Sequence, residues 1–261
     1  MAPPVDPDQV LALAHRAALD AGALLRRRFR GPASGVQSKS TRTDLVSDAD
    51  REAEALLVGM IRAARPEDAI VAEEGVGVAG ASGLRWLVDP LDGTINYLWG
   101  VPHWSVSLAC LDAEGPLVGV VHDPNRDETF TAVRGGGARL GGGPLALEGA
   151  PALEDALVAT GFHYDAGARA RQAVRLARML PLVRDVRRFG SAALDLAWVA
   201  AGRYDAFVET SLAPWDWAAG GLLVTEAGGA VREIETGDGP DPGLVAGRPA
   251  LMEPLTALVL G

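Results

Sequence analysis

The stretch Asp89-Pro90-Leu91-Asp92-Gly93-Thr94-Ile95-Asn96-Tyr97 decides how the rest of the chain is interpreted. A mostly apolar run, residues 84–88, leads into it and predicts a buried strand. Pro90 favours an extended backbone at Asp89, so we expect the strand to end there, with Asp92 following across a tight turn closed by Gly93. Two carboxylates this close repel each other unless a cation lies between them, and hard oxygen ligands of this kind suit Mg²⁺.

A helix that begins near Thr94 would place an anion site beside the metal site, because the backbone N–H groups of Gly93 and Thr94 would point outward toward a phosphate. Asp-Pro and Asp-Gly are also ordinary turn dipeptides, so the two acids alone favour a surface turn. All nine residues together match the signature Asp-Pro-(Leu/Ile)-Asp-Gly-Thr-x-Asn-(Phe/Tyr). On this match the chain resembles the inositol monophosphatase family.

Composition sets limits on the class of protein. The chain has 261 residues, 48% of them hydrophobic, which is enough for a large core. Its net charge of −10 argues against electrostatic binding of nucleic acid. Cys110 is the single cysteine, so no intrachain disulfide forms. We see neither a signal peptide nor an apolar run long enough to span a membrane, and we therefore expect a cytoplasmic protein without nucleic-acid or membrane partners.

Two elements before the central motif also match the family. The family's Lys…Asp-x-Val-(Thr/Ser)-x-x-Asp element is matched by Lys39, Asp44, Val46, Ser47 and Asp50. By resemblance, Asp44 is the acid that pairs with Thr94, although from the residues alone it would be a simple loop acid. Glu73-Glu74 follows a short predicted strand, residues 69–72, and paired acids there are usually solvated. The resemblance makes Glu73 a metal ligand and leaves Glu74 either behind it or solvated.

The second half of the chain carries three further candidate elements. Ser191 in Gly190-Ser191-Ala192 is a natural helix N-cap, and Asp216 in Trp215-Asp216-Trp217 also occupies an N-cap position. The resemblance implies more: residues 190–192 line the substrate pocket, Glu209 accepts a substrate hydroxyl, and Asp216 binds metal.

Together these elements predict one site. The resemblance implies two or three Mg²⁺ ions, whose ligands would be Glu73, Asp89, the Leu91 carbonyl, Asp92 and Asp216. It implies attack on phosphorus by metal-activated water without a phosphoenzyme, and the expected catalytic residues are Glu73, Thr94 and Asp44. The expected substrate-binding residues are Asp92, Gly93, Thr94, Gly190, Ser191, Ala192, Glu209 and Asp216.

The order of predicted elements suggests two lobes. A meander of strands ends near residues 144–151, and helices then alternate with strands. We expect an N-terminal α+β lobe, residues 1–147, that carries the metal-binding motif, and a C-terminal α/β lobe, residues 148–261, that completes the site. The family fold implies a layered α-β-α-β-α sandwich of the sugar-phosphatase type, and the family habit implies a lithium-sensitive homodimer.

The substrate is less sharply indicated than the reaction. Thr94-Ile95-Asn96-Tyr97 resembles the branch that acts on inositol 1-phosphate or a similar polyol phosphate. Relatives act on fructose 1,6-bisphosphate, histidinol phosphate or 3′-phosphoadenosine nucleotides, and Arg187, Arg188 and His163 leave room for a second phosphate. A different class also stays open, namely a regulatory or RNA-machinery binding protein that has kept the fold.

Overall fold

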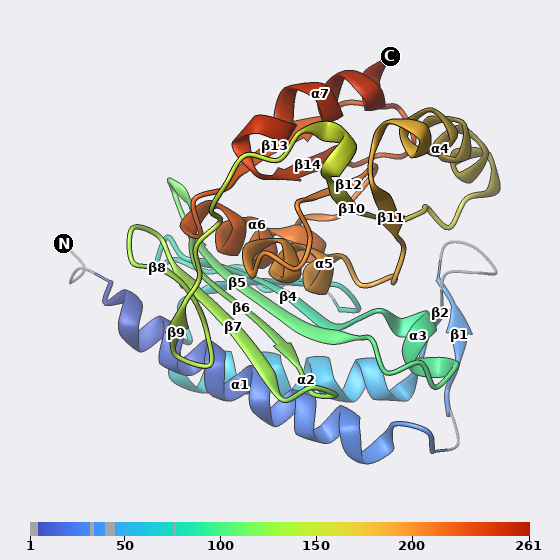
Figure 1. The fold of residues 1–261 in the computed structure, drawn as a ribbon. Coiled ribbons are helices and arrows are strands. Elements are labelled where there is room, and N and C mark those ends of the chain that lie inside the picture. Colours follow the sequence, from blue (N-terminus) through green and yellow to red (C-terminus); the bar gives the residue numbers. More distant parts are fainter. Residues whose placement is uncertain (1–4, 32–33, 40–44, 76) are drawn as a thin grey trace.

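The computed structural model describes residues 5–31, 34–39, 45–75 and 77–261. Its elements stack in five layers (Figure 1). Helices α1 (Pro7–Arg28) and α2 (Asp48–Ala64) cover one face of a seven-stranded sheet, and α5 (Ala192–Ala200) and α6 (Pro214–Glu226) lie between it and a five-stranded sheet. Helices α4 (Ala166–Met179) and α7 (Pro249–Leu260) cover the outer face of the second sheet. This is the mixed, layered α-β-α-β-α fold that the family resemblance implied.

The larger sheet carries the central motif. Its strands run in the order β3 (Ala69–Ala72), β4 (Arg85–Asp92), β5 (Ser105–Asp112), β6 (Gly115–Asp123), β7 (Glu128–Val133), β8 (Gly137–Leu140) and β9 (Gly143–Pro144). Only the β3–β4 pair within this sheet is parallel.

Strand β4 continues past the point where the sequence predicted its end. Asp89 pairs with Ser107, and after an irregularity at Pro90 the pairing resumes between Asp92 and Ser105. The prediction that the strand stops at Asp89 is therefore wrong, because a bulge accommodates the proline without ending the ladder. As a result, Asp89 and Asp92 both lie in the last four residues of β4.

The smaller sheet has the order β11 (Asp185–Arg187), β10 (Leu157–Thr160), β12 (Ala206–Glu209), β14 (Gly243–Gly247) and β13 (Ala230–Ile234). Strands β11, β10 and β12 are mutually parallel. Strand β14 pairs antiparallel with both β12 and β13. Between the sheets' strands the chain forms α3 (Thr94–Leu98), two 3₁₀ turns (Leu153–Asp155 and Leu180–Leu182), and the small pair β1 (Gln37–Ser38) and β2 (Leu45–Val46).

Local signals explain where the first helices begin. Asp6 caps α1 by accepting a hydrogen bond from the backbone of Asp8, and Ser47 and Asp50 form a reciprocal capping box at the start of α2. Asp and Ser are preferred N-cap residues, so both starts follow from the residue types at these positions. Cys110 is fully buried in β5, as a small core residue should be. No helix of the described residues has both the length and the apolar character needed to cross a membrane.

The close approach of α6 to the larger sheet depends on Gly119. A β-carbon on this residue of β6 would lie 2.9 Å from the carbonyl oxygen and 3.1 Å from the α-carbon of Ala219. Backbone atoms cannot move aside without shifting the helix. We expect Gly119→Ala to lower the free energy of unfolding in urea by about 1–3 kcal/mol.

Gly59→Ala is the matched control, because Gly59 lies on the exposed face of α2 with nothing within 4 Å of an added β-carbon. That variant should gain roughly 0.5–1 kcal/mol of stability. A Gly119→Ala protein as stable as the wild type would show that α6 does not need this contact.

Candidate active site

The predicted acids line one cleft of about 320 Å³. One wall comes from the larger sheet and from the motif that follows β4, and the other comes from loops after β10 and β12 and between β13 and β14. The cleft is lined by Lys39, Glu73, Asp89, residues 91–94, residues 161–164, Arg188, Gly190, Ala192, Glu209, residues 211–213, Trp215, Asp216, Pro240 and Asp241.

Four of these acids lie close enough together for their charges to affect one another: Glu73, Asp89, Asp92 and Asp216. Asp89 is 1% exposed, and the Leu91 amide donates to its Oδ1 at 3.0 Å. Burial raises the pKa of Asp89 well above its usual range, and the neighbouring charges of Glu73, Asp92 and Asp216 raise it further. Burial, Glu73 and Asp92 likewise raise the pKa of Asp216. Each of these acids is therefore costly to ionise beside the others in the absence of a cation.

Asp92, the last residue of β4, is held by the N-terminus of α5. Its carboxylate accepts hydrogen bonds from the Ser191 hydroxyl at 2.5 Å, the Ala193 amide at 2.8 Å and the Ala192 amide at 3.3 Å. Burial raises the pKa of Asp92 to about 6, although these three donors oppose the shift. Ser191 occupies the N-cap position of α5, as predicted, but its side chain makes no capping bond, and the Asp92 carboxylate accepts from the first turn instead.

Asp216 also departs from its predicted local role. Helix α6 begins at Pro214, so Asp216 is the third helical residue rather than the N-cap. Its Oδ2 accepts a hydrogen bond from the backbone amide of Ala213 at 2.8 Å, which is the returning half of a capping box. This bond fixes the side chain beside Asp89 and Asp92.

Thr94 has a partner that the sequence interpretation missed. Its Oγ1 lies 3.0 Å from Asp50 Oδ1 and 3.0 Å from the Leu91 carbonyl oxygen, so the single hydroxyl proton serves one acceptor at a time. The expected partner, Asp44, lies outside the described residues. Asp50 was interpreted as a match to the family element without a role at Thr94, and its position in both that element and the capping box was the available signal.

Gly93 allows the motif to turn into α3. Its φ of +92° lies in the left-handed region, and an added β-carbon would meet the carbonyl oxygens of His103 and Gly190 at 3.1 and 3.2 Å. Asn96 fixes the same junction, because its amide donates to the carbonyl oxygens of His103 and Phe189, each at 2.7 Å. The central motif thus holds the segment before α5 in place.

Lys39 lies at the edge of the acidic cluster and pairs with both members of the Glu73–Glu74 pair, at 2.7 Å for Glu73. Glu74 is not solvated, since only 7% of its side chain is exposed, and burial followed by the charge of Glu73 raises its pKa to about 7. Within the described ranges, no three His, Cys, Asp or Glu side chains converge closely enough to hold an ion as they stand. The donor set itself fits a divalent cation, because it consists of hard oxygens whose mutual repulsion a cation would relieve.

Glu209 marks the other end of the cleft. Burial raises its pKa to about 7, while nearby Arg188 opposes the shift. No described residue donates a hydrogen bond to its carboxylate, which leaves it free to accept one from a ligand. Arg188 and His163, two of the residues considered for a second phosphate, line the cleft, whereas Arg187 pairs with Asp185 at 2.6 Å. Of the predicted pocket residues, Gly190 and Ala192 line the cleft, and Ser191 reaches it through Asp92.

Comparison with known proteins agrees with this arrangement. The sequence model described as the inositol monophosphatase family matches residues 6–259. The chain belongs to the inositol monophosphatase family. The inositol-1-monophosphatase of Rhizobium meliloti (strain 1021) is 45% identical over 229 residues, covering 86% of this chain and 85% of that protein. The Nus factor SuhB of Escherichia coli (strain K12) is 40% identical over 252 residues, covering 95% and 94%.

Solved structures of family members have the same fold. The extragenic suppressor protein suhB from Bartonella henselae superposes with a TM-score of 0.90 at 38% identity, covering 96% of this chain and 98% of that one. The Thermotoga maritima IMPase gives a TM-score of 0.85 at 32% identity, with 96% of both chains covered. Inositol monophosphatases are metal-dependent phosphatases, which accords with the chemistry of the acidic cluster.

Repulsion among the acids of the cluster predicts how the stability of the metal-free protein depends on pH. An acid with a raised folded-state pKa favours the folded state at low pH, and that contribution is lost as the pH rises toward its folded-state pKa. We expect Asp89→Asn, stripped of metal with EDTA, to melt roughly 5 °C above the wild type at pH 8 and close to it at pH 4. The asparagine oxygen keeps the acceptor for the Leu91 amide.

Thermal melts at both pH values, with and without Mg²⁺, check this. Asp20→Asn, at an exposed position on α1, is the control and should follow the wild type throughout. An Asp89→Asn protein that is less stable than the wild type at pH 8 without metal would contradict the repulsion argument.

Proposed function

We propose that this chain is a Mg²⁺-dependent phosphate monoester hydrolase that acts on inositol 1-phosphate or a similar polyol monophosphate. One observation carries the proposal: four mutually repelling acids share a cleft with Gly93 and Thr94, where α3 begins. Family membership supports the reaction class, and the geometry supports the roles given below.

The cleft needs added cations before it can bind an anion. It is lined by six acids, Glu73, Asp89, Asp92, Glu209, Asp216 and Asp241, against the cationic side chains of Lys39 and Arg188. A phosphate dianion entering this field would be repelled. We assign the metal to Glu73, Asp89, the Leu91 carbonyl, Asp92 and Asp216. When bound, Mg²⁺ supplies charge neutralisation and lowers the pKa of a coordinated water.

The chain's own residues would then orient the reactants. Glu73 and the Thr94 hydroxyl are placed to hold the attacking water and to take its proton, with Thr94 oriented by an acid behind it. That acid is Asp50 in the described structure, and the family pairing with Asp44 remains a proposal. The amides of Gly93 and Thr94 would bind phosphate oxygens. No nucleophilic side chain is required, so we expect no phosphoenzyme.

The alcohol end of the cleft favours a polyol over a second phosphate. Glu209 offers an acceptor to a substrate hydroxyl, and residues 190 and 192 flank the cleft beside it. Arg188 is close enough to both Glu209 and Asp195 to oppose the rise in their pKa values, so its charge is already shared by two acids. A second phosphate would therefore meet a region without net positive charge. Fructose 1,6-bisphosphate, histidinol phosphate and 3′-phosphoadenosine nucleotides are the alternatives to test.

A second candidate function is a binding role, as in relatives named Nus factor SuhB. The E. coli protein of that name is 40% identical to this chain over almost its full length. Such a role does not require the acidic cluster to be retained, so the cluster favours catalysis as the primary function.

Phosphate release from a substrate panel tests the proposal. We expect Mg²⁺-dependent turnover that is highest with myo-inositol 1-phosphate and that falls more than about 100-fold in Asp92→Asn, which changes a metal ligand. Asp20→Asn is the matched control on the remote face of the protein and should keep full activity. Millimolar lithium should inhibit.

Two outcomes would redirect the assignment. A higher kcat/KM for one of the alternative phosphates would keep the reaction and change the substrate. No turnover on any compound, with Mg²⁺ present and the fold intact by circular dichroism, would refute the hydrolase and leave the binding role.

We also propose a homodimer, as the family resemblance implied. Large apolar side chains are exposed near α3: Trp99 is 68% exposed, Val101 43% and Phe189 42%. Burying them would favour association. Sedimentation should give twice the mass of the chain, and Trp99→Ser should shift the equilibrium toward monomer, whereas a wild type that sediments as a monomer at micromolar concentration would exclude the dimer.

A further inference from the structure

The carboxylate of Glu209 rests directly on Gly161. A β-carbon on Gly161 would lie 2.0 Å from Glu209 Oε2 and 2.2 Å from its Cδ and Oε1. Gly161 comes directly after β10, and Glu209 ends the neighbouring parallel strand β12. The Glu209 carboxylate therefore occupies the space that a side chain at position 161 would need.

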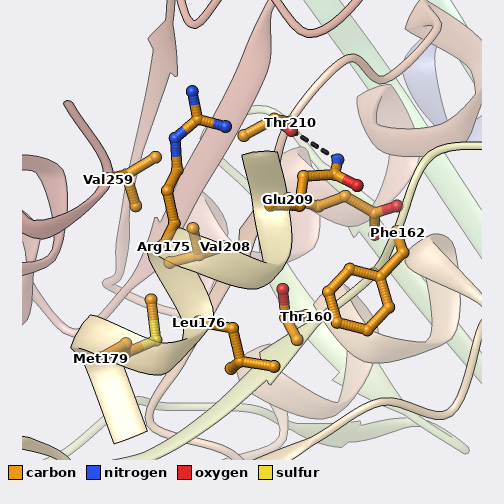
Figure 2. Close-up of a pocket in the computed structure, with 11 residues that line it drawn as sticks. Thr160, Phe162, Arg175, Leu176, Met179, Val208, Glu209, Thr210 and Val259 are labelled. Atoms are coloured by element: carbon orange, nitrogen blue, oxygen red, sulfur yellow. Dashed lines mark hydrogen bonds between the residues drawn. The ribbon is translucent and has the colours of Figure 1, made fainter. Parts of the chain in front are cut away.

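Glu209 lines both the cleft and a smaller cavity of about 30 Å³, which Figure 2 shows, and Gly161 and Phe162 also line both. The smaller cavity is lined by polar residues, among them Thr160 and Thr210, and by apolar side chains of α4 such as Leu176 and Met179. Its volume suffices for a single water molecule and excludes a larger ligand. The carboxylate therefore has the cleft on one side and a space no larger than a water molecule on the other.

A chain of buried hydrogen bonds runs behind the same wall. The His163 amide donates to Gln172 Oε1 at 2.9 Å, Gln172 Nε2 donates to Thr210 Oγ1 at 2.6 Å, and Thr210 donates to Asp238 Oδ2 at 2.7 Å. Figure 2 shows the bond at Thr210 immediately beside Glu209. Gln172, Thr210 and Asp238 are each 5% exposed.

Two arginines of α4 complete this network. Arg171 donates to Asp238 Oδ1 at 2.8 Å, and Arg175 pairs with the other carboxylate oxygen. The hydrogen bond from Thr210 and the two guanidinium groups outweigh the effect of burial and hold the pKa of Asp238 below its usual range. A network whose members are buried and hydrogen-bonded is rigid, and removing one member leaves the others unpaired.

The network joins three loops that form one wall of the cleft. His163 belongs to the loop after β10, Thr210 to the loop after β12, and Asp238 to the loop between β13 and β14. Each loop also supplies residues that line the cleft, whereas Gln172, Thr210 and Asp238 do not line it. The three polar side chains can therefore reach a substrate only by positioning residues that touch it.

We propose that Gly161 and the Gln172–Thr210–Asp238 network position Glu209 and its wall so that the enzyme selects phosphate esters of polyols over phosphate esters of alcohols without further hydroxyl groups. The proposal rests on the hydrolase function above and assigns its selectivity to residues outside the acidic cluster. The phosphate end, built on β4 and α3, is separate from this wall and is shared by all substrates.

The ratio of kcat/KM for myo-inositol 1-phosphate to kcat/KM for p-nitrophenyl phosphate measures this selectivity. Gly161→Ala and Thr210→Val should each lower the ratio about tenfold, mainly through a higher KM for the inositol ester. Hydrolysis of p-nitrophenyl phosphate should stay within about twofold of wild type, because its leaving group has no hydroxyl for Glu209. Glu209→Gln changes the acceptor itself, and its ratio is the reference against which the ratios of the other two variants are compared.

Matched variants separate positioning from damage to the fold. Thr210→Ser keeps the hydroxyl and should restore the wild-type ratio, and Gly59→Ala should not change it. In Gly161→Ala the atoms that must move are the end of the Glu209 side chain, so the variant should fold normally. Circular dichroism and thermal melts check the folding of each variant.

The possible outcomes separate the positioning proposal from the hydrolase function on which it rests. A lower ratio in Gly161→Ala and Thr210→Val, with rescue in Thr210→Ser, supports the proposal. An unchanged ratio, or a parallel loss on both substrates, overturns it and leaves the hydrolase function standing. A wild-type chain that hydrolyses neither ester with Mg²⁺ refutes the hydrolase function, and the selectivity inference fails with it.

Discussion

The site depends on the contact between the carboxylate of Asp92 and the first turn of α5. Asp92 ends a strand of the larger sheet, while Ser191, Ala192 and Ala193 begin a helix that packs against both sheets. Three donors and the helix dipole offset part of the cost of burying this charge. Because the same segment brings Gly190 and Ala192 to the cleft, one interaction sets the distance between the acids and the residues around the substrate.

The remaining acids are less well compensated. Asp216 accepts one backbone amide and Asp89 accepts one, yet both have raised pKa values because they are buried near Glu73 and Asp92. Lys39 provides the nearest positive charge by pairing with Glu73. A fold that accepts this repulsion is less stable than its core would allow, which is the usual relation between stability and activity at sites that bind cations.

Much of this could be predicted from sequence, and the failures have local causes. The long motif indicated the family and the layered fold, and helix starts such as Asp6 and Ser47 followed from capping chemistry. The predicted end of β4 at Asp89 was wrong because Pro90 lies in a bulge, which the sequence pattern does not reveal. Ser191 is the N-cap residue of α5, as predicted, but the acceptor of the first-turn hydrogen bonds was missed because Asp92 lies 99 positions away in the chain. Contacts of that kind depend on tertiary structure.

The two walls of the cleft therefore carry different constraints. Substitutions near Asp92 move α5, and α5 also carries Asp195, a buried acid whose pKa is raised by burial and by Glu209 and Asp92. Changes there alter the reaction and the substrate pocket together. The loops joined through Gln172 have no hydrogen bond to Asp92 among the described residues. The loop after β12 does reach Asp216 through the Ala213 amide, so under the positioning proposal selectivity for the alcohol changes through these loops without altering the acids only where that bond is kept.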